Sequence, residues 1–147
     1  MTVSDALRNV TRLGLDTPPV IYFAEEHPVY FPVCRAVFQA ISSGEIHAAT
    51  SAVTLTETLV KSIRLADAAA IAIYRQILGN PLLPLTDVTR LQADNAADLR
   101  ARYNLKMADA LQISCAMTAG CDAFLTGDKD LRRVAEIHVL VLDDLTT

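Results

Sequence analysis

The sequence predicts an α/β fold, in which a central parallel sheet of about five short strands is flanked by helices in three layers. Short, almost wholly apolar segments alternate along the chain with longer segments that have helical apolar spacing. Continuous apolar strands are typical of parallel sheets that are covered on both faces. The chain has 147 residues and contains no repeat, low-complexity segment or linker, so we expect residues 1–147 to form a single domain.

Five segments are expected to be strands, because each is short and apolar and is bounded by turn residues or charged residues. They comprise residues 12–16, 46–50, 81–86, 122–126 and 138–143. Pro81 and Pro84 keep the third of these strands short, since proline cannot donate to a sheet.

Helices are expected between these strands. They comprise residues 17–26, 29–44, 52–65, 66–79, 87–103, 108–120 and 128–135. The first contains Pro18 and Pro19 where a helix begins, and Gly120 suits a helix end. The apolar face expected for the helix at 87–103 consists of Val88, Leu91, Leu99 and Tyr103.

Composition excludes several functional classes. The formal net charge of −4 and the pI of about 5.2 argue against nucleic-acid binding by bulk charge, so any action on nucleic acid must be local or metal-assisted. No apolar run approaches the roughly 20 residues that span a bilayer, and the first residues lack the shape of a signal peptide. We therefore expect a cytoplasmic protein without membrane association. No two cysteines of the chain form a C-x-x-C pair. We therefore expect buried reduced thiols at Cys34, Cys115 and Cys121.

Four acidic residues lie where the expected strands end or the following helices begin. Asp16 ends the first strand, Glu57 is expected in the first turn of the helix after the second strand, Asp109 opens the helix at 108–120, and Asp128 follows the fourth strand. Ligands of parallel α/β sheets bind beyond the carboxyl ends of the strands, where the strand order switches. All four carboxylates can therefore lie at the same edge of the sheet.

Each of these acids also has an ordinary structural interpretation. Asp16 can cap a helix, Glu57 follows Thr54 at capping-box spacing, Asp109 suits a helix dipole, and Asp128 suits a turn. Together, however, four carboxylates in one cleft would repel one another, and a divalent cation would remove that repulsion. An oxygen-only ligand set favours Mg²⁺ or Mn²⁺ without distinguishing them, and such ions support phosphoryl chemistry.

The same residues carry a family resemblance. The segments GLDTPPVIYFAEEHP, TSAVTLTETL and ADALQISCAMTAGCDAFLTGDKDL resemble the PIN domain, in particular the VapC-like branch of bacterial toxin–antitoxin ribonucleases, over roughly residues 13–142. Asp16 with Thr17 matches the first motif, Glu57 the second, and Asp109 in Asp-Ala-Leu the third. Thr126 and Asp128 match a Thr-x-Asp motif after an apolar strand.

The resemblance implies a metal-dependent endoribonuclease that cleaves RNA, as the toxin of a type II toxin–antitoxin pair. Asp16, Glu57, Asp109 and Asp128 would form the Mg²⁺ or Mn²⁺ pocket, with Asp16 and Asp109 as the most direct ligands. Glu57 would ligate the ion or orient the attacking water, and Asp128 would hold a second ion or act through water. Thr126 would support the pocket by hydrogen bonds, although an ordinary strand-end threonine explains it equally well.

The resemblance also implies protein partners. Family members usually form homodimers through helices in the first half of the chain, and the apolar segment VYFPVCRAVF offers such a face, unless it is ordinary core. An antitoxin would wrap the toxin through its C-terminal segment and insert a basic side chain into the acidic pocket.

The chain departs from the family pattern in three respects. Pro18 stands where many members have Asn or Ser, and residues 1–11 form an N-terminal extension that is either a short added helix or a consequence of the chosen start codon. Because the chain is acidic, phosphate contacts must come from a few basic residues, whose alternative role is a solvated helix face. The candidates are Arg100, Arg102, Lys106, Lys129, Arg132 and Arg133.

Two other classes of enzyme are disfavoured, and one alternative function stays open. Aspartyl-phosphate enzymes need a second acid beside the first-strand Asp, but Thr17 and Pro18 occupy those positions, and no P-loop sequence is present. The same fold with an inert pocket would instead serve as a protein-binding or scaffold module. A neighbouring gene for a DNA-binding antitoxin would favour the toxin, and a solitary gene would favour a housekeeping nuclease or an interaction role.

Overall fold

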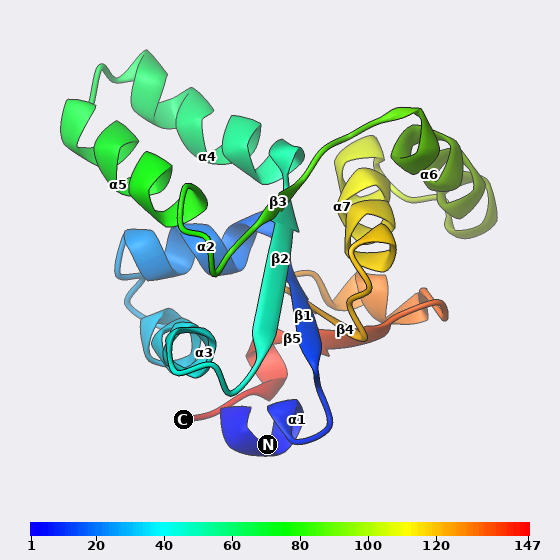
Figure 1. The fold of residues 1–147 in the computed structure, drawn as a ribbon, viewed down its shortest axis with the longest axis horizontal. Coiled ribbons are helices and arrows are strands. Elements are labelled where there is room, and N and C mark those ends of the chain that lie inside the picture. The colour runs from blue at the N-terminus through cyan, green and yellow to red at the C-terminus, as the bar shows by residue number, and fades with distance from the viewer.

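The computed structural model describes residues 1–147, and five parallel strands form its single sheet (Figure 1). The strand order is β3-β2-β1-β4-β5, and every adjacent pair is parallel. The strands are β1 (Arg12–Leu15), β2 (His47–Ser51), β3 (Leu85–Thr86), β4 (Ala123–Thr126) and β5 (His138–Val141). The α/β fold and the parallel sheet expected from the sequence are therefore confirmed.

Seven α-helices surround this sheet and complete the three layers. They are α1 (Val3–Leu7), α2 (Thr17–Ala24), α3 (Phe31–Ser42), α4 (Ala52–Arg64), α5 (Ala68–Leu78), α6 (Arg90–Tyr103) and α7 (Met107–Thr118). Two short 3₁₀ helices, η1 (Lys129–Arg133) and η2 (Leu142–Asp144), follow the last two strands. In Figure 1, α2 to α5 lie on one side of the sheet and α6 and α7 on the other. None of the helices is both long and apolar enough to cross a membrane.

The apolar core is divided by the sheet into two parts. Leu13, Leu15 and Leu125 point to the face covered by α1 to α5, and they belong to the larger cluster of buried side chains. Phe124 points to the opposite face and packs in the smaller cluster with residues of α6 and α7, such as Ile113. Adjacent residues of β4 thus serve different cores, as the period-two geometry of a strand requires.

Strand β1 lies at the centre of the sheet and marks the switch in strand order. It pairs with β2 on one side and with β4 on the other, with Leu15 opposite Leu125. The chain leaves β1 at Asp16, whose backbone N–H donates to Leu125 O at 2.9 Å. The carboxyl ends of β1 and β4 are therefore held side by side, at the position where α/β sheets bind their ligands.

Helix α7 approaches β1 closely at Gly14. A Cβ atom at Gly14 would lie 2.8 Å from Ala116 Cβ and 3.1 Å from Phe124 Cδ2, which is too close for ordinary packing. Glycine is required here because the helix and the strand backbone meet with no room for a side chain. This contact sets the distance between the helix that carries Asp109 and the strand that directly precedes Asp16.

Several boundaries differ from the sequence-based expectations. Strand β3 has only two residues, because Pro84 directly precedes it, and the helix expected at 128–135 is the 3₁₀ helix η1. The expected apolar face of α6 is partly wrong, since Val88 lies outside the helix and Leu91 is exposed. Its buried residues are Gln92, Ala96 and Leu99.

The N-terminal extension is an integral part of the fold. Residues 3–7 form α1, whose Val3 and Leu7 are buried in the larger core. Val3 N–H donates to Thr146 O at 2.9 Å, so the two ends of the chain lie together. The short helix expected within residues 1–11 is therefore present as α1.

We expect Gly14→Ala to lower the free energy of unfolding by about 1–3 kcal/mol, because the new methyl group overpacks the contact with α7. The compensating variant Ala116→Gly should recover part of this loss when it is combined with Gly14→Ala. Urea unfolding of both single variants and the double variant measures this coupling. Strictly additive losses would contradict the proposed contact.

Candidate active site

Asp16 is a buried carboxylate at the carboxyl end of the central strand. It is the N-cap of α2, and its Oδ1 accepts a hydrogen bond from Thr17 N at 2.8 Å. Its Oδ2 accepts a hydrogen bond from the Thr126 hydroxyl at 2.7 Å. The side chain is thus oriented from two elements, α2 and β4.

Thr126 connects Asp16 to the turn that carries Asp128. It is the last residue of β4, it is fully buried, and its Oγ1 also accepts a hydrogen bond from Asp128 N at 3.0 Å. Asp128 is the exposed N-cap of η1, and its Oδ1 accepts from Asp130 N at 2.9 Å. The interpretation of Asp128 as a turn residue and its place at the sheet edge are therefore compatible.

Glu57 does not lie where the sequence analysis placed it. Helix α4 begins at Ala52 and is capped by Ser51, whose side chain accepts from Val53 N at 3.1 Å. Glu57 is therefore in the second turn, and the expected capping box with Thr54 is wrong because Thr54 lies inside the helix. The Glu57 side chain is exposed, and its Oε1 accepts a hydrogen bond from the Thr17 hydroxyl at 2.7 Å.

Asp109 lies in the first turn of α7, as expected, and is half-buried. Its carboxylate makes no hydrogen bond or ion pair within the chain. Desolvation raises the pKa of Asp109, and the neighbouring charge of Asp128 raises it further, whereas Lys106 acts in the opposite direction.

The pKa of Asp16 is affected by two of the other acids. Burial raises the pKa of Asp16 to about 6, although the hydrogen bonds from Thr126 and Thr17 act to lower it. The negative charges of Asp109 and Glu57 also raise it. Asp16, Glu57 and Asp109 are thus within electrostatic reach of one another, and Asp128 is within reach of Asp109.

The four acids nevertheless do not form a finished metal site. No three Asp, Glu, His or Cys side chains are arranged so that they could hold one ion. The chemistry of the donors fits a hard cation, because all are carboxylate oxygens. Their mutual repulsion is offset only at Asp109, by the charges of Lys106 and Arg133. Coordination would require side-chain rotation. Asp109 has no hydrogen bond to lose in doing so, whereas the exposed Asp128 would give up the bond that its Oδ1 accepts from Asp130 N.

A buried polar network beneath Glu57 was missed by the sequence analysis. Gln112 of α7 donates to Thr17 at 2.9 Å and to Thr54 at 2.7 Å, and it accepts from Ser51 at 2.5 Å. No buried side-chain nitrogen or oxygen in the protein lacks a hydrogen-bond partner. The available signal was a glutamine three residues after Asp109, within an otherwise apolar stretch of helix.

The structure separates the candidate phosphate-binding residues into two groups. Most of the arginines are engaged in structural contacts, such as Arg102 with Asp98 and Glu136, and Arg132 with Asp144. Arg100 donates to Leu105 O, and Arg133 donates to Tyr103 O. By contrast, Lys106 and Lys129 are exposed and make no ion pair or side-chain hydrogen bond.

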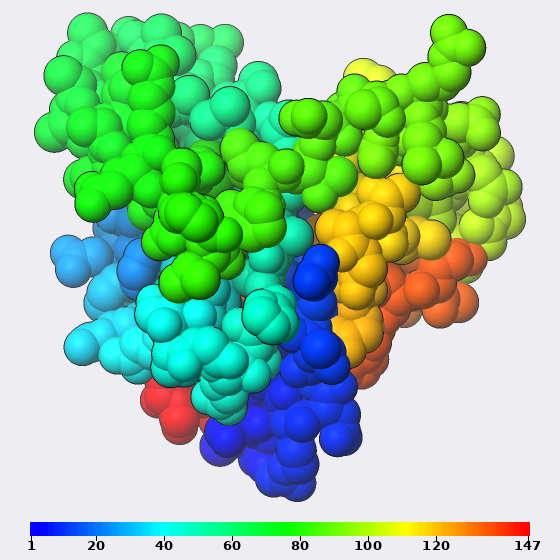
Figure 2. Space-filling view, viewed as in Figure 1, coloured from blue at the N-terminus to red at the C-terminus, as the bar shows by residue number.

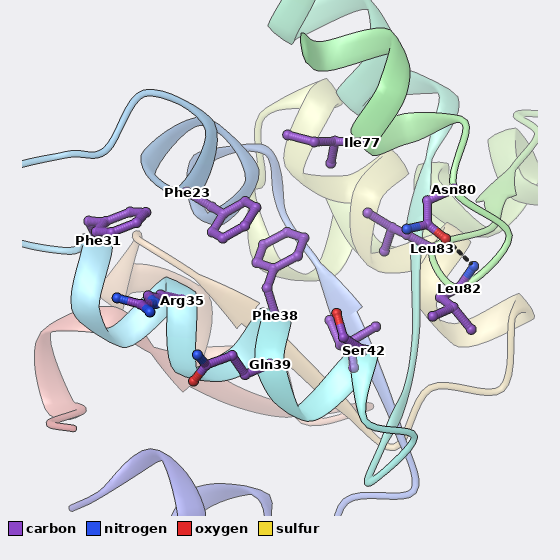
Figure 3. Close-up of a pocket in the computed structure, with 11 residues that line it drawn as sticks. Phe23, Phe31, Arg35, Phe38, Gln39, Ser42, Ile77, Asn80, Leu82 and Leu83 are labelled. Atoms are coloured by element: carbon purple, nitrogen blue, oxygen red, sulfur yellow. Dashed lines mark hydrogen bonds between the residues drawn. The ribbon is translucent and has the colours of Figure 1, made fainter.

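An apolar groove lies away from the acids, on the side of α2, α3 and α5. Figure 3 shows Phe23 and Phe38 facing each other in it, with ring centroids 4.1 Å apart, and Phe31 beside them. The groove has a volume of about 430 Å³ and is closed on the far side by Ile77 and Leu83. The partly buried Phe31 and Phe38 of α3 thus line a groove, whereas Val33 and Val37 of the same helix are buried in the core.

Comparison with known proteins identifies the family. The sequence pattern of the PIN domain matches residues 15–137, which is most of the chain. The chain therefore belongs to the PIN domain family, and the resemblance noted in the sequence is confirmed. No curated protein sequence matches the chain.

Solved structures of similar fold come from toxin–antitoxin systems. VapBC2 from Rickettsia felis, bound to a promoter DNA fragment, has a TM-score of 0.70 at 15% identity and covers 89% of this chain and 98% of its own. DNA-bound VapBC from Salmonella typhimurium has a TM-score of 0.69 at 18% identity, and the match covers 90% of this chain and 98% of the VapBC chain. VapC20 from Mycobacterium tuberculosis, a toxin that cleaves the sarcin–ricin loop, has a TM-score of 0.66 at 16% identity and covers 87% and 99%. At these identities the likeness establishes the fold.

The buried charge of Asp16 is expected to destabilise the metal-free protein. The pKa of Asp16 is higher in the folded protein than in the unfolded chain. The loss of stability caused by its charge is therefore complete above about pH 6, and it disappears as the pH falls toward the pKa of Asp16 in the unfolded chain. Asp16→Asn should therefore raise the free energy of unfolding by about 1–3 kcal/mol at about pH 8, with a smaller gain at about pH 5.

Urea unfolding in EDTA at both pH values measures this effect. Asp94→Asn is the matched control, because Asp94 is exposed and makes no hydrogen bond, and it should change stability little. A loss of stability in Asp16→Asn at about pH 8 would show that its hydrogen bonds outweigh its desolvation.

Proposed function

We propose that this protein is a metal-dependent endoribonuclease and the toxin of a VapBC-type pair. The observation that carries the proposal is the buried Asp16 at the switch point of the sheet, with Asp109 and Glu57 within electrostatic reach and no cation of the chain beside it. Such an arrangement is costly unless a divalent cation compensates it. PIN domains are typically nucleases of this metal-dependent kind, which supports the same conclusion.

Asp16 and Asp109 would hold a Mg²⁺ or Mn²⁺ ion, and Asp128 would complete the pocket directly or through water. The ion would supply polarisation of the scissile phosphate and stabilisation of the leaving oxygen. Thr126 and the Thr17 backbone hold the Asp16 carboxylate in one orientation, in which it would face the pocket. Glu57 Oε1 is occupied by the Thr17 hydroxyl, so Oε2 is free to accept a proton from the attacking water.

RNA would reach this pocket through local contacts, because the net charge of −4 repels its backbone. The unpaired Lys106 lies at the N-cap of α7, beside Asp109, and Lys129 follows Asp128. The surface is notched between the α4–α5 lobe and the α6–α7 lobe, which offers a place for a strand of RNA (Figure 2).

An antitoxin is the proposed protein partner, since the similar structures include toxin–antitoxin complexes. The groove lined by Phe23, Phe31 and Phe38 suits the apolar face of a partner helix. We also propose a homodimer, but not through the buried residues of α3. The exposed Val60, Ile63 and Leu65, in or just after α4, offer a better face.

An inert scaffold is the second candidate function. It is favoured by one observation, that no three carboxylates are arranged for an ion. A scaffold would bind no divalent cation at these acids, so metal binding separates the two candidates.

We expect the purified protein to cleave RNA with Mg²⁺ or Mn²⁺ and not with EDTA. Asp109→Asn should reduce the rate about 100-fold or more, because it removes a charge that would hold the ion. Asp94→Asn, an exposed acid on α6, should cleave like the wild type. Equal loss in both variants, or cleavage in EDTA, would contradict the metal pocket. Absence of both cleavage and metal binding would favour the scaffold.

Lys106→Ala and Lys129→Ala should weaken RNA binding without abolishing cleavage. Each variant should reduce the slope of log KM against log salt by about 0.7–1, as expected for the loss of one phosphate contact. Arg8→Ala, at the residue after α1, is the control, because Arg8 pairs with Asp5 at the opposite end of the strands. An unchanged salt slope in both lysine variants would place the RNA elsewhere.

A further inference from the structure

A buried network of one amide and four hydroxyls lies beneath Glu57 and joins four elements. Its members are Thr17 of α2, Thr50 and Ser51 of β2, Thr54 of α4 and Gln112 of α7. All are nearly inaccessible to solvent, with exposed fractions of 5% or less. A network this well buried has few alternative arrangements, so the direction of each hydrogen bond can be deduced.

The directions of the hydrogen bonds can be followed from Thr50, the member of the network that bonds to the backbone of β1. The Thr50 hydroxyl donates its single proton to Leu15 O at 2.8 Å. Thr50 can therefore only accept in its 2.8 Å contact with Thr54, and the Thr54 proton must point to Thr50. Thr54 consequently has no proton left for any other partner.

The orientation of the Gln112 amide is fixed by Ser51. The Ser51 oxygen accepts a hydrogen bond from Val53 N, which leaves its proton free to donate to Gln112 Oε1 at 2.5 Å. The amide oxygen therefore faces Ser51, and the two protons of Nε2 go to Thr54 and Thr17. Both Nε2 protons and one oxygen lone pair are used.

Thr17 accepts from Gln112 Nε2 and keeps its own proton to donate. That proton goes to the Glu57 carboxylate oxygen Oε1 at 2.7 Å, which is a closer and stronger acceptor than the Thr54 hydroxyl at 3.2 Å. A reversed Gln112 amide would present its oxygen to Thr17 and take that proton away from Glu57. The orientation of Gln112 therefore determines whether Glu57 has a donor.

Glu57 depends on this donor because nothing else in the chain holds it. The side chain is exposed and makes no ion pair, and the Thr17 hydroxyl is its single hydrogen-bond partner. Without that bond, the three side-chain torsions of Glu57 would be free to rotate away from Asp16.

We propose that Gln112 is a positioning residue, which directs the Thr17 proton to Glu57 and so keeps this carboxylate at the metal pocket. The inference rests on the proposed function, because it assigns a use to the position of Glu57. Gln112 does not touch the reacting atoms and acts only through Thr17.

The test compares Mn²⁺ affinity, measured by calorimetry, in Gln112→Leu and Thr17→Val with the wild type. Each variant keeps approximately the original shape. Thr17→Val removes the donor to Glu57, whereas Gln112→Leu removes the amide that donates to both Thr17 and Thr54, so that the Thr17 proton can turn from Glu57 to the Thr54 oxygen 3.2 Å away. The Mn²⁺ dissociation constant should rise about tenfold in each, which is the lower end of the usual effect for groups that orient metal ligands. The double variant should be no weaker than either single variant, because the same contact is lost.

Two further variants separate positioning from general stability. Thr17→Ser keeps the hydroxyl and should restore Mn²⁺ affinity to within about twofold of the wild type. Ser114→Ala removes another buried hydroxyl of α7, which donates to Gln92 O at 2.8 Å, and should lower the melting temperature without changing Mn²⁺ affinity. Gln112→Met and Thr17→Val carry the test if Gln112→Leu does not fold.

The structure of metal-free Gln112→Leu, or of Gln112→Met, gives a readout that does not depend on catalysis. Loss of the contact between Thr17 and Glu57 would support the inference, and its retention would overturn it. Wild-type Mn²⁺ affinity in both Gln112→Leu and Thr17→Val would also overturn it. If the wild type itself neither binds Mn²⁺ nor cleaves RNA, the proposed function fails, and the structural readout still decides the role of Gln112.

Discussion

The burial of one carboxylate at the end of the central strand is the constraint on which the site depends. Asp16 is desolvated, yet it is held by the Thr17 backbone and by the Thr126 hydroxyl, so its side chain cannot turn to solvent without leaving a buried hydroxyl unpaired. The other acids are arranged around this fixed charge. Burial raises the pKa of both Asp16 and Asp109, and repulsion from the neighbouring acids raises it further.

The packing of the sheet explains why this charge can be held in place. Gly14 lets α7 approach the central strand at Ala116, and the same helix carries Asp109 in its first turn and Gln112 one turn later. A helix displaced by a larger side chain would move both residues relative to Asp16. The core and the acidic pocket therefore share one rigid contact, and the stability of the fold and the geometry of the site are linked.

If the proposed function is right, the four acids form a metal site that is prepared without being complete. The inner part is rigid, since Asp16, Thr126 and the Gln112 network are buried and fully hydrogen-bonded. The outer part is adaptable, since Glu57 and Asp128 are exposed and Asp109 has no partner. Such a division would allow a cation to draw the outer carboxylates inward while the inner carboxylate stays still. The stability lost by burying Asp16 would be recovered on binding.

Local patterns in the sequence were sufficient for the fold class and for part of the site. Apolar strands alternating with helices predicted the parallel sheet, and Asp16, Asp109 and Asp128 were placed correctly at element ends because caps and turns are local features. Glu57 was misplaced by a turn, because the real cap is Ser51 and the Thr54–Glu57 spacing imitates a capping box. The apolar face of α6 was partly misjudged, since propensity does not reveal which side of a helix meets the sheet.

What the sequence by itself determined is therefore the order of the elements and the acids that end them, since both follow from neighbours in the chain. Only the tertiary structure decided which polar groups meet. Gln112 and Thr17 are 95 residues apart, and their hydrogen bond exists because α7 packs against the strand that precedes α2. The pairing of Arg102 with Glu136, 34 residues away, and the absence of a partner for Lys106 are likewise decided by packing. Contacts of this kind depend on how separate elements approach one another, which no local pattern encodes.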